Sequence, residues 1–201
     1  MYIQSETDLR ALLGFPKDRA KNKQLDELEK HSIHFIRLSP FLTLSSHDAS
    51  GHVDCSPRGG KPGFVKVINN KCILIPESKG NNRLDSLLNL LATGNIGCLF
   101  LIPGVDETLR INGTARISTS TEHLALFTEE RNPPKVCIEI TITEVFLHCA
   151  KSLMRSELWS IDSQIERSSL PTMGIMINEQ LAVTDIPESQ NEMLKRYKKD
   201  L

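Results

Sequence analysis

The strongest constraint on the fold is a series of short apolar or alternating stretches, with turn signals every ten to fifteen residues. We expect strands within residues 40–46, 52–56, 64–68, 72–75, 96–102, 108–118 and 136–146. A parallel sheet would need regular alternation of strands and helices, and that alternation is found only around residues 72–102. The pattern therefore predicts a mainly β fold with helical additions, an α+β barrel rather than a doubly wound sheet.

Short helical patterns lie between and around these stretches. We predict helices over residues 5–13, 22–37, 82–92 and 121–128. The third has four leucines on one face at helical spacing, Leu84, Leu87, Leu88 and Leu91. A chain of 201 residues fits one domain over residues 1–201. Within it we expect a core barrel over 25–160, an N-terminal helical flank over 1–24 and a C-terminal extension over 161–201.

Composition excludes several classes of protein. The formal net charge is −1, so no global basic field indicates nucleic-acid binding, and any anion site must be local. No apolar run approaches the ~18 residues of a membrane span, and the first ten residues lack the apolar centre of a secretory signal. The five cysteines are scattered and odd in number, which favours reduced thiols and a cytoplasmic location.

The segment Lys79-Gly80-Asn81-Asn82-Arg83 is the best candidate for a phosphate site. It precedes a predicted helix, where free backbone N–H groups and the positive end of the helix dipole attract an anion. Lys79 adds a point charge, and Arg83 can bind two phosphate oxygens at once. A capped helix with solvated surface charges is the alternative interpretation of the same residues.

Two further pairs could contact a bound ring or phosphate. Ser56 and Arg58 follow a predicted strand, although a surface loop is the better explanation when these residues are taken alone. Arg110 and Asn112 are two residues apart on one strand and should share a face, which could be a binding surface or a solvated outer one. An arginine beside a flavin ring would stabilise the negative charge that reduction produces.

Other kinds of site are not indicated. No G-x-G-x-x-G motif follows a strand, so a Rossmann dinucleotide site is not expected. His47, His52 and Cys55 are explained by a hairpin turn better than by zinc, and we expect no metal site. No Ser/His/Asp or Cys/His set has the context of a nucleophile, so hydrolysis is not expected and no catalytic residue is assigned.

Four segments together resemble the pyridoxamine 5′-phosphate oxidase-like superfamily of FMN-binding split β-barrels, and in particular an uncharacterised bacterial subgroup. They are DCSPRGGKPGF (54–64), LIPESKGNNRLDSLLNLL (74–91), LFLIPGVDETLRINGTARI (99–117) and HCAKSLMRSELW (148–159). The resemblance covers roughly residues 25–160. It implies a six-stranded split barrel and a homodimer with two FMN sites at the interface.

The resemblance also implies roles for individual residues. Lys79, Asn81 and Arg83 would meet the phosphate, Ser56 and Arg58 the ring or phosphate, and Arg110 with Asn112 the ring. The C-terminal segment would contribute His148, Lys151, Arg155 and Trp159, from the same or the other subunit. The Arg/His substrate motif of true pyridoxamine phosphate oxidases is not visible, and Gly-Gly-Lys follows Ser-Pro-Arg where relatives carry an Asp.

These residues and the resemblance predict a cytoplasmic FMN-dependent oxidoreductase that transfers hydride or electrons at flavin N5. Its partners would be a second copy of the chain and a small-molecule substrate or electron donor, with no nucleic acid and no membrane. The alternatives are a non-catalytic protein that binds FMN, the deazaflavin F420 or haem, with His148 as the haem ligand, and a barrel without ligand that acts as an interaction domain.

Overall fold

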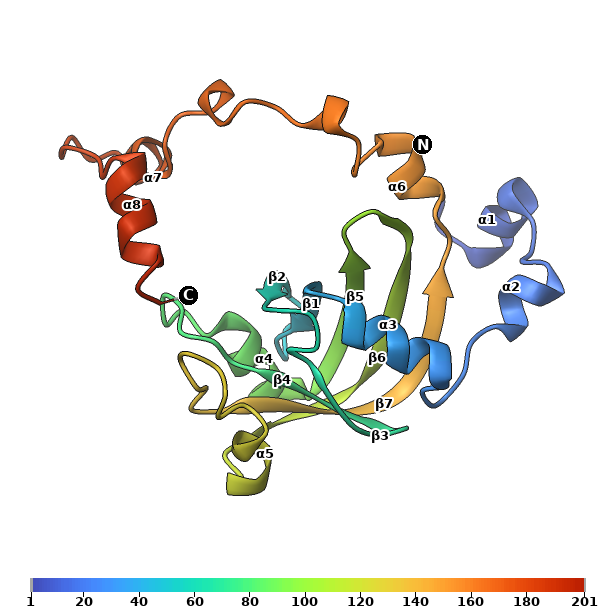
Figure 1. Cartoon of the computed structure of the whole chain (residues 1–201). Helices are drawn as coiled ribbons and strands as arrows, with labels where there is room; N and C mark the ends of the chain where they lie inside the picture. The colour runs from blue at the N-terminus through green and yellow to red at the C-terminus, as the bar shows by residue number, and fades with distance from the viewer. Residues whose placement is uncertain (1, 201) are drawn as a thin grey trace.

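The computed structural model describes residues 2–200 and is built on one antiparallel sheet (Figure 1). Its strands lie in the order β2-β1-β5-β6-β7-β4-β3. Their bounds are Phe41–His47 (β1), Val53–Gly59 (β2), Lys66–Asn69 (β3), Cys72–Pro76 (β4), Asn95–Ile102 (β5), Val105–Ser118 (β6) and Cys137–His148 (β7). Each stretch that alternation marked in the sequence forms a strand, and the mixed α+β class is confirmed.

The number of strands matches the seven stretches expected from the sequence pattern and differs from the number that the resemblance implied. The resemblance implied six strands in a barrel, whereas the sheet has seven, and β2 and β3 form its two edges, so the sheet is open. The β3–β4 hairpin joins the sheet through β7, with Ile73 opposite Ile140. Burial explains this pairing, because Ile73, Leu74 and Ile75 are all fully buried and need β7 as a neighbour.

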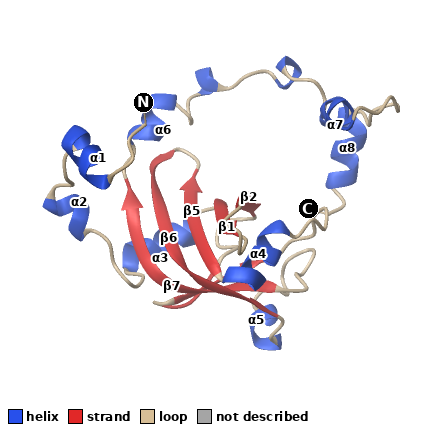
Figure 2. Cartoon of the chain, turned by 180° about the vertical axis from the view of Figure 1, so that it is seen from behind, coloured by secondary structure: helices blue, strands red, loops and turns tan. Residues whose placement is uncertain are grey.

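The core lies on the concave side of the sheet. Leu42 and Leu44 of β1, Phe100 of β5, and Leu109 and Ile111 of β6 are all fully buried there. Helix α3 (Lys30–Leu38) packs on this side through Ile36, and its first turn is capped by Glu29, which accepts hydrogen bonds from the N–H groups of His31 and Ser32. Seen from behind, α3 lies beyond the sheet, so Figure 2 shows the opposite face of β5, β6 and β7.

The expected helix over 22–37 is wrong in its first half. The chain instead forms a short helix α2 (Asp18–Asn22), then an extended segment, and only then α3. Leu25 exchanges two backbone hydrogen bonds with Val145, at 3.0 and 2.8 Å, and the Leu28 N–H donates to Asn70 O at 2.7 Å. These long-range bonds hold the segment extended and outweigh its helical spacing of apolar residues.

The other helices flank the sheet or leave it. The expected first helix is α1 (Glu6–Leu13), whose cap Ser5 accepts from the Asp8 N–H. The leucine-rich helix is α4 (Asp85–Thr93), which ends at Gly94 with φ 69° and packs by Leu87 and Leu90. Further along are α5 (Thr121–Ala125), α6 (Lys151–Ser156), α7 (Met173–Leu181) and α8 (Gln190–Tyr197), with 3-10 turns at Ile161–Ser163 and Arg167–Ser169. Among the described residues no helix has the length and apolar character needed to cross a membrane.

Candidate functional site

A chain of polar side chains links β2 to the first turn of α4. The Ser86 hydroxyl donates to Asp54 Oδ2 at 2.8 Å and lies 2.7 Å from Ser56 Oγ, which also accepts from Arg58 Nη1 at 2.9 Å. Ser86 is 3% exposed, so these hydrogen bonds are shielded from water. The predicted residues Ser56 and Arg58 are therefore held beside the start of α4 rather than in a mobile loop.

Arg58 also faces a buried carboxylate. Its Nη2 lies 3.3 Å from Glu77 Oε2, and the two side chains are 16% and 21% exposed. Arg58 Nε and Glu77 Oε2 are buried and have no hydrogen-bond partner among the described residues. Burial raises the pKa of Glu77, and the neighbouring Arg58 opposes that rise. The site thus holds a guanidinium with an unused donor.

The predicted phosphate segment forms an uncapped entrance to α4. Asn82 and Leu84 have positive φ of 59° and 61°, and no side chain caps the helix at Leu84. Arg83 donates its N–H to Asn81 Oδ1 at 3.1 Å and its Nε to Asp85 Oδ2 at 2.8 Å. Lys79 Nζ pairs with Asp200 Oδ1 at 2.6 Å. Arg83 precedes the cap residue Leu84, and Lys79 lies in the loop that leads to it; both cations are largely exposed and form ion pairs, within residues 2–200, only with surface carboxylates.

A hollow of about 310 Å³ lies next to this entrance, between the β1–β2 turn and α4. Its charged lining is mostly acidic, with Asp48, Asp54 and Asp85 against Arg83 and the imidazole of His52. Asp48 is committed to its own turn, because it accepts from the backbone N–H groups of Ser50 and His52. The negative charge makes this hollow a poor place for an anion, so a phosphate bound to Arg83 would have to lie toward Lys79 and outside the hollow.

Arg110 and Asn112 lie together on the convex face of the sheet, as the alternation predicted. Arg110 lies opposite Leu99 of β5 and Phe146 of β7, and Asn112 lies opposite Gly97 of β5 and Glu144 of β7. The Arg110 guanidinium is 5.4 Å from the centre of the Phe146 ring, and Asn112 Nδ2 donates to Glu144 Oε2 at 2.8 Å. Neither side chain is fully exposed, so this face is a partly ordered polar surface.

The predicted residues therefore form two groups on opposite faces. Arg58 lies opposite the buried Leu42, so its side chain points to the concave side. Its neighbour Pro57 lies opposite Thr43, and the same row continues across β5 and β6 through Leu99 to Arg110. Arg110 therefore points to the convex side. Within one chain, Ser56 and Arg58 lie near the entrance to α4, and Arg110 and Asn112 lie beyond the sheet. The expectation that all of them surround one ligand is not met by a single copy of the chain.

The C-terminal segment is only partly joined to these groups. The pKa of His148 is lowered by burial and then by the positive charges of Arg110 and Lys23, and His148 Nδ1 is buried without a hydrogen-bond partner among the described residues. Trp159 Nε1 donates to Val105 O at 2.9 Å and borders a shallow hollow of about 330 Å³ with Leu153 and Met154. Within residues 2–200 no hydrogen bond or ion pair involves the side chains of Lys151 and Arg155.

Several residues that build these groups were not predicted from the sequence. On the concave side they are Asp54, Glu77 and Ser86, and on the convex side Lys23, Glu144 and Phe146. Alternation could have indicated Glu144 and Phe146, because they share a strand face two residues apart. The others depend on pairings between segments far apart in the chain, which no local pattern reports.

Comparisons with solved structures give related folds at low identity. A HupZ variant from Group A Streptococcus is 17% identical over 60% of this chain and 98% of that chain, with a TM-score of 0.50. An FMN-binding protein from Syntrophomonas wolfei is 18% identical over 58% and 81% of the two chains, with a TM-score of 0.43. HutZ, the haem storage protein of Vibrio cholerae, is 14% identical over 60% and 93%, with a TM-score of 0.44.

A comparison with curated protein sequences found no match. At such low identities the HupZ structure is evidence for the fold alone. The sequence family gives a firmer result, because the profile described as pyridoxamine 5′-phosphate oxidase matches residues 28–149, which is more than half of the chain and includes every strand of the sheet. The chain therefore belongs to the pyridoxamine 5′-phosphate oxidase family.

Proposed function

We propose that this chain is an FMN-dependent oxidoreductase that works as a homodimer with flavin sites at the interface. The observation that carries the proposal is the pair of exposed cations, Lys79 and Arg83, at the uncapped N-terminus of α4 in a member of this family. The scattered free cysteines support a cytoplasmic location, and the single continuous sheet supports one domain with flanks at both ends.

The entrance to α4 fits the phosphate of FMN. Its free N–H groups have no side-chain cap, and each cation is held by a single exposed carboxylate, Asp200 for Lys79 and Asp85 for Arg83. Exposed ion pairs contribute only about 0–1 kcal/mol, so a phosphate dianion could replace these carboxylates at low cost. Arg58 adds a third cation nearby with an unused buried Nε–H.

The convex face fits the polar edge of a flavin ring. Asn112 offers an amide, and Arg110 supplies positive charge stacked on Phe146. Bound FMN would supply hydride and single-electron chemistry, which no side chain of this chain can supply alone. Positive charge at Arg110 would favour the state of the bound group that carries more electrons, and the partly buried face around Phe146 would limit access of water.

The separation of the two groups of residues supports the proposed homodimer. Because Arg58 and Arg110 lie on opposite faces of one sheet, one chain cannot bring the entrance of α4 and the convex face to the same ligand. A two-fold axis would repeat both surfaces and could place the convex face of one copy against the α4 entrance of the other. Two equivalent sites would then form, each built from two copies.

The first experiment is a visible spectrum of the purified protein, before and after addition of FMN, followed by anaerobic titration with NADH and NADPH. We expect flavin bands and their bleaching by a reduced nicotinamide or by another donor. Absorption bands at the positions of a deazaflavin would show that the bound cofactor is F420 and not FMN. A colourless protein that does not take up FMN at micromolar concentration would contradict it.

Haem binding is a second candidate, favoured by His148. Its Nδ1 is buried without a hydrogen-bond partner among residues 2–200, and burial with two neighbouring cations lowers its pKa, which favours the neutral imidazole that ligates iron. Titration with haemin should then give a Soret band that His148→Ala weakens. A Soret band that is unchanged in that variant would exclude His148 as the ligand.

A further inference from the structure

The C-terminal arm, residues 161–200, leaves its apolar side chains uncovered. Apart from Met193, no described residue of the arm is buried, and Ile161, Ile165 and Ile186 are 82%, 70% and 97% exposed. Helix α7 has no buried residue although it contains Met173, Ile175 and Ile177. Helix α7 contacts the segment before α8, where Asn178 Nδ2 donates to Asp185 O at 2.7 Å and Gly174 lies against the backbone of Glu188, but this contact buries none of its residues. A helix of nine residues is marginal in water unless more of its apolar surface is covered.

The arm is attached to the body at both of its ends. At its start, Trp159 Nε1 donates to Val105 O at 2.9 Å. At its end, Asp200 pairs with Lys79 at 2.6 Å, and Arg131 Nη1 donates to Lys198 O at 3.3 Å. Figure 1 shows the arm between these points as an arc away from the sheet. A surface that covers the arm must therefore come from outside this copy of the chain.

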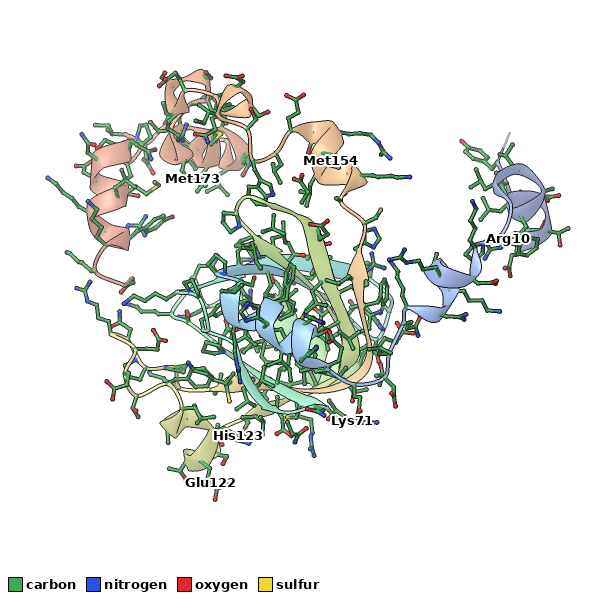
Figure 3. All side chains as sticks on the ribbon, turned by 45° about the vertical axis from the view of Figure 1, so that its right-hand side comes forward. Arg10, Lys71, Glu122, His123, Met154 and Met173 are labelled. Atoms are coloured by element: carbon green, nitrogen blue, oxygen red, sulfur yellow. The ribbon has the colours of Figure 1, made fainter. Side chains whose placement is uncertain are left out.

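The N-terminal flank, residues 2–24, also leaves its apolar side chains uncovered. Neither α1 nor α2 contains a buried residue, and Leu12, Leu13 and Phe15 are more than two thirds exposed. The arm begins near the flank, but its helices α7 and α8 lie on the opposite side of the molecule from α1 and α2, as Figure 1 shows and as Arg10 and Met173 mark in Figure 3. The uncovered apolar side chains of α7 therefore do not cover those of the flank in the same copy.

Charge makes these two surfaces complementary. Residues 161–189 of the arm carry five acidic residues and one basic residue, whereas residues 14–24 of the flank carry four basic residues and one acidic residue. Most of these charges are uncommitted: among residues 2–200 no ion pair is formed by Glu179 and Asp185 of the arm or by Lys17 and Lys21 of the flank. Opposite charges around two apolar patches favour their association and fix its orientation.

We propose that the arm of each copy docks on the N-terminal flank of a second copy of this chain. The inference rests on the proposed homodimer and adds a second pair of contacts to the one between the convex face and the α4 entrance. A two-fold axis exchanges the two sides of the molecule, so the arm of one copy meets the flank of the other, and the same contact forms twice. The arms thereby enclose the partner and bury α1, α2 and α7.

Charge reversal in the full-length protein tests the proposal. The arm variant is Glu179→Lys with Asp185→Lys, the flank variant is Lys17→Glu with Lys21→Glu, and the third protein carries all four changes. Analytical ultracentrifugation should show dimer dissociation constants raised about tenfold in each of the first two and restored in the third. The matched control, Glu122→Lys with Glu129→Lys on the surface around α5, should leave the dimer unchanged. Arm and flank variants that behave like the control, or a third protein no tighter than they are, would overturn the proposal.

Cross-linking shows which copy the arm touches. A mixture of isotope-labelled and unlabelled protein, coupled by a carbodiimide, should give labelled-to-unlabelled links between Lys17 or Lys21 and Glu179 or Asp185. Links between arm and flank that never join the two isotopic forms would overturn the proposal. FMN titration of the same samples separates the two claims: flavin binding without exchange of arms overturns this inference alone, and arm exchange without flavin binding overturns the flavin proposal alone.

Discussion

Arg58 and Glu77 form a largely buried ion pair between β2 and the end of β4, with 3.3 Å between Nη2 and Oε2. The pair joins an edge strand to the segment that leads into α4, so it connects the two sides of the candidate phosphate site. Burial raises the pKa of Glu77, and the attraction of Arg58 limits that rise. The ionised carboxylate is therefore stable in the fold mainly because Arg58 is present.

Arg58→Met should destabilise the protein in a pH-dependent manner. The pKa of Glu77 in the folded protein lies above its ordinary value of 4.5. The free energy of unfolding therefore falls as pH rises above 4.5, because the buried carboxyl loses its proton. This loss of stability is complete once the pH exceeds the pKa of Glu77 in the folded protein. Without Arg58 the folded pKa rises further and the cost grows. We expect a loss of about 2 kcal/mol at pH 7 and less than half of that near pH 4, measured by urea unfolding.

The control for this prediction is Arg116→Met. Arg116 pairs with Glu139 at 3.5 Å but is 81% exposed, so its loss should cost at most about 0.5 kcal/mol at either pH. Equal losses at pH 4 and pH 7 in Arg58→Met would show that the effect comes from lost packing and not from the charge of Glu77.

Much of the fold follows from local patterns. The turn at Asp48–Gly51 has Gly51 at φ 88°, and the hairpin that it closes was expected from its composition. The leucine spacing predicted the helix α4 but not its packed face, because Leu88 and Leu91 are exposed and Leu90 is buried. Alternation placed Arg110 and Asn112 on one face. In each case the information lies within a few residues of the element that it specifies.

The parts that the sequence did not predict depend on long-range pairing. The β-bridge between Leu25 and Val145 keeps residues around Leu25 out of the predicted helix, and no residue near Leu25 in the sequence indicates this bridge. Glu77 looks like an ordinary loop residue until β2 brings Arg58 beside it. That Arg58 and Arg110 face opposite sides follows only from the register of four strands. Residues of the candidate site could therefore be named from the sequence, but their arrangement in space could not be predicted from it.

Gly113 should tolerate no side chain. It lies at a β-bulge between β6 and β7, where an added Cβ would lie 2.1 Å from Thr141 O, a backbone atom that cannot move away on its own. Gly113→Ala should cost about 3 kcal/mol of unfolding free energy, measured in urea. Gly80→Ala serves as the control, because no atom lies within 4 Å of its Cβ, and a similar loss there would contradict the steric explanation.

Arg110→Ala should lower the midpoint potential of bound FMN. Loss of a positive charge near the ring removes stabilisation of the state that carries more electrons, by roughly 30 mV, or about 1.4 kcal/mol for a two-electron couple. Arg116→Ala removes the same charge from the same strand at a position opposite Glu139 and should leave the potential unchanged. Spectroelectrochemistry measures both, and equal potentials in the two variants would remove Arg110 from the flavin site.

Lys79→Ala and Arg83→Ala should each weaken FMN binding by about tenfold, the usual effect of one charge-assisted hydrogen bond to phosphate. Riboflavin has the same ring but no phosphate, so its affinity should be nearly the same in both variants as in the unmodified protein. Fluorescence titration with the two ligands separates the phosphate site from the ring site. If both variants lose FMN and riboflavin equally, the loop before α4 supports the ring site or the fold, and the phosphate must bind elsewhere.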